Sequence, residues 1–144
     1  MTPVPTALLG PVVALVGWTF VMWGWMYATR IPAMVRARMR LDPDAPRGAQ
    51  MATLPPAVRW KADNYNHLHE QPMLFYAVAI VLALCGRSGG LDLVLAWSYV
   101  GVRVVHSVWQ ATRNVIQVRF ALFVLGTLVL AALTVRAACA VASA

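Results

Sequence analysis

The chain has 144 residues, of which 60% are hydrophobic and only 12% are charged, and its formal net charge is +7 at pH 7. This composition excludes an ordinary water-soluble domain, in which about a quarter of the residues are charged. It also argues against a nucleic-acid partner, because seven of the 12 Lys and Arg residues gather between Arg30 and Lys61, beside long apolar segments. We therefore expect a single membrane domain over residues 1–144.

The first apolar segment covers roughly residues 6–34, and residues 1–29 contain no charged side chain. It lacks the basic start of a cleaved signal peptide, so we expect it to remain as the first membrane span. Its Trp and Tyr residues, from Trp18 to Tyr27, are typical of side chains that anchor a span at the membrane interface.

A loop rich in Pro, Asp and Arg follows, and three more spans are predicted at roughly 57–86, 91–113 and 116–138. Each of these segments contains or borders an apolar run. With its polar ends included, each reaches the length of about 20 residues that a helix needs to cross a bilayer. The predicted fold is therefore an all-α integral membrane protein, a four-transmembrane-helix bundle. The basic first loop is typical of a cytoplasmic segment, so we expect the first and third loops to face the cytoplasm.

The second span begins with a polar stretch, NYNHLHEQPMLFY, that contains Glu70, the only glutamate in the chain. At about 100° per residue, one helical face collects the polar residues around Glu70, whereas Lys61 and Asn64 lie elsewhere. The members of this stripe are Arg59, Asp63, Asn66, His67, Glu70, Leu74 and Ala77. An ionised carboxylate is costly in hydrocarbon, so we expect this face to turn inward, towards protein, water or a ligand.

The third span carries a matching polar column centred on Arg103. Its members are Asp92, Ala96, Tyr99, Arg103, His106, Ser107, Gln110 and Asn114. We expect the column and the stripe to face each other, within one chain or across subunits. A purely structural Glu70–Arg103 ion pair is one explanation, but the two faces hold more polar groups than one pair uses, which favours a binding site.

The charges of these residues suit a zwitterionic ligand with more than one carboxylate. Arginines at positions 30, 59, 103, 113 and 119 offer guanidinium groups to carboxylates, and Glu70 suits an ammonium group. The sequence shows no activated nucleophile of its own, so a thiol carried by the ligand is attractive, since a neighbouring arginine would stabilise its thiolate form. Zinc bound by His67, Glu70 and His106 is a weaker alternative, and no metal site is predicted.

Two motifs resemble the MAPEG family, the membrane-associated proteins in eicosanoid and glutathione metabolism. NYNHLHEQPMLFYAVA is similar to a bacterial branch with the pattern Asn-Phe-x-Asn-Leu-Phe-Glu-x-Pro-x-Leu-Phe-Tyr. GVRVVHSV, which begins at Gly101, resembles the third-span Arg-Val-x-His-Thr/Ser-Val pattern of the prostaglandin E synthase branch. The resemblance implies a homotrimer in the bacterial inner membrane that binds membrane lipids and a lipophilic small molecule.

The resemblance also implies glutathione as a co-substrate between adjacent subunits, and a transferase or peroxidase activity on a lipophilic electrophile. Arg119 is then the catalytic residue that stabilises the thiolate. The implied glutathione-binding residues are Arg30, Arg59, Asn66, His67, Glu70, Tyr99, Arg103, His106, Gln110 and Arg113.

Three residues depart from the pattern of the glutathione-using members. Asp63 stands where those members have an arginine, and Gln71 and Gln110 replace tyrosines found in some of them. These departures favour an alternative function, a non-catalytic membrane protein that binds a lipid or an amphipathic anion in the same cleft.

Overall fold

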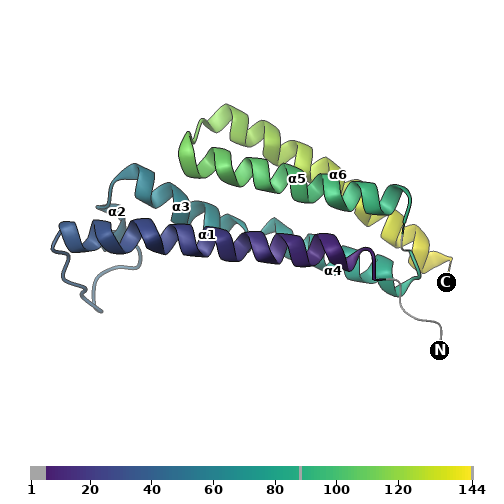
Figure 1. Ribbon diagram of the computed structural model, residues 1–144, viewed down its shortest axis with the longest axis horizontal. Coiled ribbons are helices and arrows are strands. Elements are labelled where there is room, and N and C mark those ends of the chain that lie inside the picture. Colours follow the sequence, from purple (N-terminus) through teal and green to yellow (C-terminus); the bar gives the residue numbers. More distant parts are fainter. Residues whose placement is uncertain (1–5, 88, 144) are drawn as a thin grey trace.

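A computed structural model describes residues 6–87 and 89–143, and over these residues the chain is helical and contains no strand. The helices of this part of the chain are α1 (Leu9–Arg36), α2 (Ala49–Ala52), α3 (Pro56–His67), α4 (Gln71–Leu84), α5 (Leu91–Thr112) and α6 (Ile116–Ala142) (Figure 1). Four segments are long and apolar enough to cross a membrane, namely α1, α3 with α4, α5, and α6. The predicted all-α, four-span membrane fold is confirmed.

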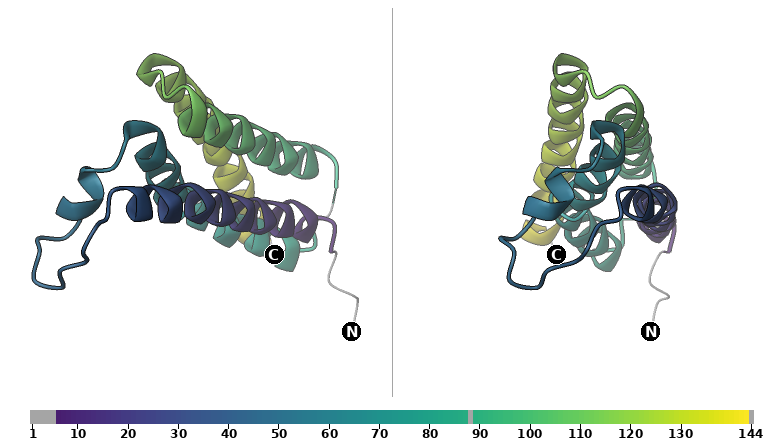
Figure 2. Two further views of the ribbon diagram at one scale, coloured as in Figure 1. Left: turned by 60° about the vertical axis from the view of Figure 1, so that its left-hand side comes forward. Right: turned by 90° about the vertical axis from the view of Figure 1, so that its left-hand side faces the viewer.

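The helices form two groups that pack against each other. The α5–α6 hairpin lies across α1, α3 and α4, and α5 contacts both α1 and α3 (Figures 1 and 2). The core between them consists of fully buried apolar side chains such as Leu15, Met22, Phe75, Leu82 and Leu133. The α1–α3 and α5–α6 connections share one end of the molecule, and the α4–α5 connection and the end of α6 share the other.

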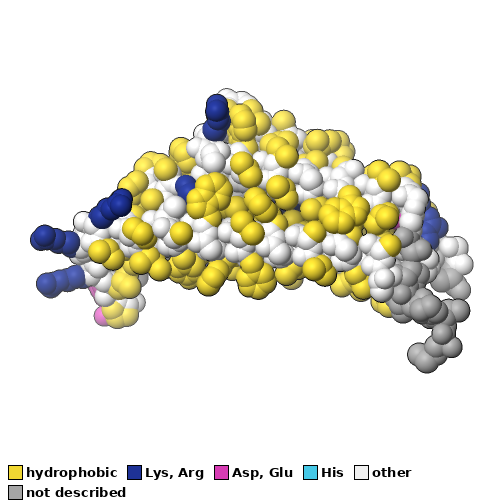
Figure 3. Space-filling model, viewed as in Figure 1, with side chains coloured by type: hydrophobic (Ala, Val, Ile, Leu, Met, Phe, Trp, Pro, Cys, Tyr) yellow, Lys and Arg dark blue, Asp and Glu magenta, His cyan; other side chains and the backbone are white. Residues whose placement is uncertain are grey.

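The outer surface fits a lipid environment. Large apolar side chains such as Phe20, Leu74 and Leu128 are more than half exposed. On the face drawn in Figure 3, hydrophobic side chains cover the length of the helices, and Lys and Arg gather at the end where α1 meets the loop before α2. A soluble monomer rarely exposes so continuous an apolar surface, so these sides of the bundle are suited to contact acyl chains.

The second span is interrupted in its middle, where α3 ends at His67 and α4 begins at Gln71. Pro72 accounts for the interruption, because proline has no N–H to donate to the Leu68 carbonyl four residues earlier. The span predicted at roughly 57–86 is thus formed by two helices, over Pro56–Leu84. The two helices nevertheless bury one common face, which runs from Asn64 through Leu68 and Pro72 to Phe75.

The turn between α5 and α6 positions the start of α6. Asn114 adopts a left-handed conformation with φ of 51°, and asparagine tolerates this region better than most residues. Its backbone N–H donates to the Trp109 carbonyl, which closes the end of α5. Its side-chain Oδ1 accepts a hydrogen bond of 2.6 Å from Nη1 of Arg119, and this fixes the arginine in the first turn of α6.

Candidate functional site

The polar column of α5 is buried, as predicted from its spacing. Asp92, Tyr99, Arg103, His106, Ser107 and Gln110 are each at most 2% exposed. They face α3, α4 and α6 rather than the lipid side of the helix. This column supplies most of the buried polar atoms of the bundle.

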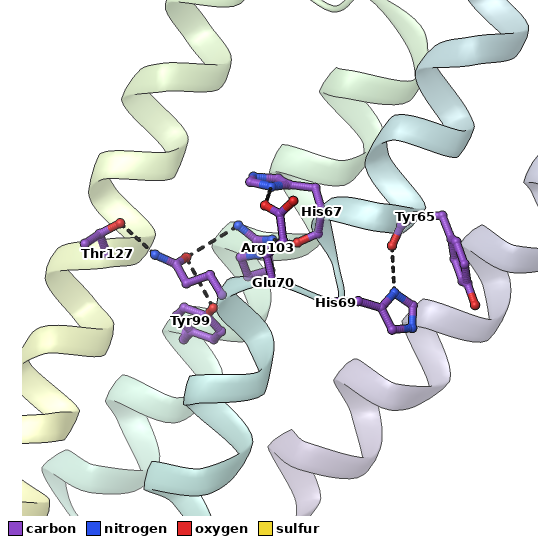
Figure 4. A network of polar contacts seen from close by, with 8 residues as sticks. Tyr65, His67, His69, Glu70, Tyr99, Arg103 and Thr127 are labelled. Atoms are coloured by element: carbon purple, nitrogen blue, oxygen red, sulfur yellow. Dashed lines mark hydrogen bonds and ion pairs between the residues drawn. The ribbon is translucent and has the colours of Figure 1, made fainter. Parts of the chain in front are cut away.

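Arg103 lies at the centre of the column and is only 1% exposed. Its Nη2 donates to the backbone carbonyl of His67 at 3.0 Å, and its Nη1 donates to Oε1 of Gln71 at 3.5 Å (Figure 4). The guanidinium therefore holds the last carbonyl of α3, at the interruption of the second span. It forms no ion pair with Glu70, whose Oε2 instead accepts a 2.6 Å hydrogen bond from Nδ1 of His67.

Gln71 joins three helices at this level. Its Oε1 also accepts a hydrogen bond of 3.3 Å from the Tyr99 hydroxyl, and its Nε2 donates to the Thr127 hydroxyl at 2.7 Å. Gly126 of α6 lies close to this amide, since a Cβ there would be 3.7 Å from Oε1 of Gln71, an ordinary van der Waals contact. The amide thus ties α4 to both α5 and α6 and fixes the position of Arg103.

A first hollow, called here the histidine hollow, has a volume of about 380 Å³ and is lined by His67, His106, Ile116, Arg119, Phe120 and Phe123. The His67 ring meets the His106 ring edge-on, with centroids 5.2 Å apart, and lies 5.6 Å from the Phe123 ring. Within the described residues, Nε of Arg119 and Nδ1 of His106 are buried without a hydrogen-bond partner. The hollow therefore combines a cation and unused hydrogen-bonding atoms with an apolar wall.

A second hollow, called here the arginine hollow, lies where α1, α2 and α3 meet and has a volume of about 430 Å³. Arg30, Arg47 and Arg59 line it together with Asp63 and Asn66. Three guanidinium groups against one carboxylate favour an anionic ligand. Arg47 was not predicted from the sequence, because its position in an irregular loop gave no periodic signal.

The polar stripe of the second span is mostly exposed within the chain, although it was expected to turn inward. Asp63, Asn66, Glu70, Leu74 and Ala77 are all exposed. The inward face is the opposite, mainly apolar one, since it packs against α1 and α5. Within one chain Glu70 is exposed and forms no ion pair with Arg103, so the facing of stripe and column across subunits stays a prediction.

A family model described as the MAPEG family matches residues 8–139. The chain belongs to the MAPEG family. Searches of curated proteins and of solved structures gave no match. Membership confirms the resemblance drawn from the two motifs, and it places the chain among membrane proteins associated with glutathione metabolism.

The residues proposed from the MAPEG resemblance fall into separate groups on one chain. His67, His106 and Arg119 come together in the histidine hollow, and Arg30, Arg59 and Asn66 line the arginine hollow. Tyr99 and Arg103 lie between helices, bonded to Gln71. Gln110 is buried on α5, and Arg113 is exposed beside the Trp109 ring, so neither lines the two hollows.

Two further polar residues of this MAPEG chain are buried and were missed. Nζ of Lys61 donates to the Ala57 carbonyl at 2.8 Å and the Ala111 carbonyl at 3.2 Å, and lies 5.1 Å from the Trp25 ring centre. Asn64 is 1% exposed on the same face. The spacing of both with Leu68 and Phe75, on the packed face, was the signal available in the sequence.

Asp92 belongs to a different cluster at the other end of α5. Its carboxylate accepts hydrogen bonds from Nε of Arg87, at 3.0 Å, and from Nε of Arg136 on α6. This cluster ties the start of α5 to the end of α6. Within residues 6–87 and 89–143 no three His, Cys, Asp or Glu side chains are grouped so as to hold a metal ion.

Proposed function

We propose that this MAPEG protein binds glutathione between the subunits of a homotrimer and uses it as the co-substrate of a transferase or peroxidase reaction on a lipophilic electrophile. The observation that carries this proposal is the histidine hollow. In it the Arg119 guanidinium lies beside Phe120 and Phe123. Such a reaction requires a cation that stabilises the thiolate and an apolar wall that binds the lipophilic electrophile.

The proposed chemistry depends on the thiolate form of glutathione, since the thiolate is the nucleophile. The Arg119 guanidinium stabilises that form by its positive charge, with Nη1 held by Asn114. In the transfer reaction the sulfur attacks an electrophilic carbon and a C–S bond forms. The bond from that carbon to its leaving group breaks with its electron pair, and the thiol proton is released to water.

Binding of the glutathione backbone draws on the other polar groups. The arginine hollow suits its carboxylates and Glu70 suits its ammonium group. On one chain the two hollows share none of their described lining residues, with Asn66 in one and His67 in the other. The interfaces of a cyclic trimer pair two different patches, so in this proposal the arginine hollow of one copy adjoins the histidine hollow of the next.

Self-association is supported independently by the exposure of Glu70. Its side chain is 65% exposed and lies in the middle of the second span, Pro56–Leu84. A carboxylate at that depth is too costly to face acyl chains, so another protein surface, water or a ligand has to cover it. The basic end of the molecule would face the cytoplasm, in a bacterial inner membrane.

The test is ultraviolet absorbance of the thiolate when glutathione is added to the pure protein in detergent. We expect a thiolate band in the wild type, its loss in Arg119→Ala, and retained binding of glutathione by calorimetry in that variant. Arg40→Ala, which changes an exposed arginine outside both hollows, is the matched control and should keep the band. A wild type that binds glutathione without any thiolate band would contradict the catalytic proposal.

A second candidate function is a non-catalytic protein that binds a lipid or amphipathic anion in the same cleft. Two observations favour it over the enzyme: Asp63 lines the arginine hollow where the glutathione-using members have an arginine, and the Arg103 guanidinium is bonded to His67 and Gln71 instead of being open to a ligand. This candidate predicts no heat on titration with glutathione and a stoichiometric phospholipid in the purified protein, measured as lipid phosphorus.

A further inference from the structure

A third hollow, called here the aromatic groove, lies between α1 and the interruption of the second span. It has a volume of about 240 Å³, and its walls include Phe20, Trp23, Tyr65, His69, Met73 and Tyr76. Its described lining shares no residue with the histidine hollow or the arginine hollow. Figure 4 shows His69 on the side of the chain opposite to His67 and Glu70. The groove is therefore separate from the site proposed for glutathione.

His69 gives this mostly apolar groove a hydrogen-bonding group of defined polarity. Its Nδ1 lies 2.8 Å from the backbone carbonyl of Tyr65. A carbonyl oxygen can only accept, so Nδ1 carries the proton and donates it. In the neutral imidazole the other ring nitrogen, Nε2, then carries a lone pair and acts as an acceptor. The groove therefore offers a hydrogen-bond acceptor, which suits a ligand that carries a hydrogen-bond donor.

The remaining walls favour a ring over an acyl chain. Four aromatic side chains line the groove, and aromatic rings gain additional energy from stacked or edge-on contacts with another ring. Met73 adds a thioether, which also makes favourable contacts with aromatic rings. The volume of about 240 Å³ is below the usual range for drug-sized ligands, about 300–1,000 Å³, so the ligand is small.

We propose that the aromatic groove binds a membrane-soluble phenol. The ring packs between Trp23 of α1 and Met73 of α4, and the hydroxyl donates to Nε2 of His69. The groove is lined by the middle of α1 and by the centre of the second span, so the ligand enters from the bilayer. A neutral phenol reaches that depth with one polar group to satisfy, and His69 satisfies it.

The test uses a matched pair of probes, 4-bromophenol and bromobenzene, on the full chain in lipid nanodiscs without glutathione. Bromine quenches tryptophan fluorescence on contact, so binding is followed by quenching. We expect 4-bromophenol to bind more tightly than bromobenzene to the wild type. The variant Trp23→Phe should lose most of the quenching at saturation if Trp23 forms the wall.

Two further variants isolate the hydrogen bond. His69→Phe keeps an aromatic ring and removes the acceptor. It should weaken the affinity for 4-bromophenol about fivefold, the effect of one hydrogen bond, and leave the affinity for bromobenzene unchanged. His67→Phe, the matched change on the other side of the chain, should alter neither affinity. Val16→Phe places an additional ring in the groove and should block both probes, which keeps the proposal testable if His69→Phe does not fold.

Three results would overturn the proposal. Equal binding of the two probes to the wild type would show a groove for any apolar group, including an acyl chain. An unchanged phenol affinity in a folded His69→Phe would remove the role of His69. Efficient cross-linking of two chains through Phe20→Cys, in a background where Cys85 and Cys139 are serine, would show that a second copy fills the groove. None of these results depends on glutathione binding.

Discussion

The second and third spans each carry a polar face of similar length, yet one is buried and the other is uncovered. On α5 the column from Asp92 to Gln110 is enclosed by neighbouring helices. On α3 and α4 the stripe from Asp63 to Ala77 is exposed. Periodicity identifies which residues share a face, but it does not say what covers that face.

The difference arises from the position of each helix in the bundle. α5 contacts α1, α3 and α6, and its polar face is the side that these contacts cover. Its polar atoms find partners within the chain, such as the His67 carbonyl for Arg103. The α3–α4 span packs through Leu68 and Phe75. On its other face His67 packs against α5 and α6, whereas Glu70, Leu74 and Ala77 are exposed. A polar face in that position is suited to contact another subunit or a ligand.

The largest effect that tests this comparison is expected from Arg103→Met. The change removes two hydrogen bonds from a charged donor, to the His67 carbonyl and to Gln71. A hydrogen bond to a charged group contributes about 1.5–3 kcal/mol, so we expect the unfolding free energy to fall by about 3 kcal/mol. The measurement is detergent-induced unfolding followed by circular dichroism. The control Arg113→Met, at an exposed site, should stay within about 0.5 kcal/mol of wild type. Similar losses in the two variants would show that Arg103 has no special structural role.

A smaller effect is expected at Gly126, where α6 approaches the same network. A Cβ there would lie 3.6 Å from Cγ1 of Val102, which is an ordinary contact, so Gly126→Ala should be neutral or slightly stabilising. Gly126→Leu overfills the space beside Gln71 and should cost about 2 kcal/mol of unfolding free energy. Thermal unfolding of both variants in detergent distinguishes them. Destabilisation by alanine equal to that by leucine would argue against close packing at this point.

The smallest effect on the fold is expected from Glu70→Gln on the uncovered stripe. The side chain is 65% exposed and its contact with His67 resembles a surface pair, which contributes about 0.5 kcal/mol or less to stability. We expect unchanged unfolding but weaker self-association or glutathione binding, measured by analytical ultracentrifugation and calorimetry. If Glu70→Gln destabilises the fold as much as Arg103→Met, the contrast between the two faces does not hold.

Much of the fold followed from the sequence because the bilayer restricts the options. Long apolar runs specify spanning helices. An uninterrupted helix such as α5 keeps a constant angular spacing, so the residues that share its polar face were predicted from the sequence. The second span was harder. Its polar stripe was identified, but a helix with a polar face and an apolar face can pack through either, and the choice depends on neighbours that the local pattern does not contain.

For the candidate site, the sequence predicted several of the residues but not the contacts that they make. Spacing and family resemblance named Arg119, His67 and His106, and the structure brings these three to one hollow. The same evidence named Arg103 as a ligand contact, whereas its bonds go to the chain itself. Hydrogen bonds over long sequence separations, such as the one from Gln71 to Thr127, leave no local signal in the sequence, so the role of Gln71 emerged only from the fold.

Lys61 has a consequence for how the chain is assembled in the membrane. Its ammonium group is held by Ala111 of α5 and lies over Trp25 of α1. Synthesis proceeds from the N-terminus, so Trp25 is present before Lys61 and Ala111 only after it. The ammonium group has three contacts, with the Ala57 carbonyl, the Ala111 carbonyl and the Trp25 ring. Before α5 enters the bilayer, only the first and the last of these are present. The third span therefore supplies the last of these three contacts to a charge that belongs to the span before it.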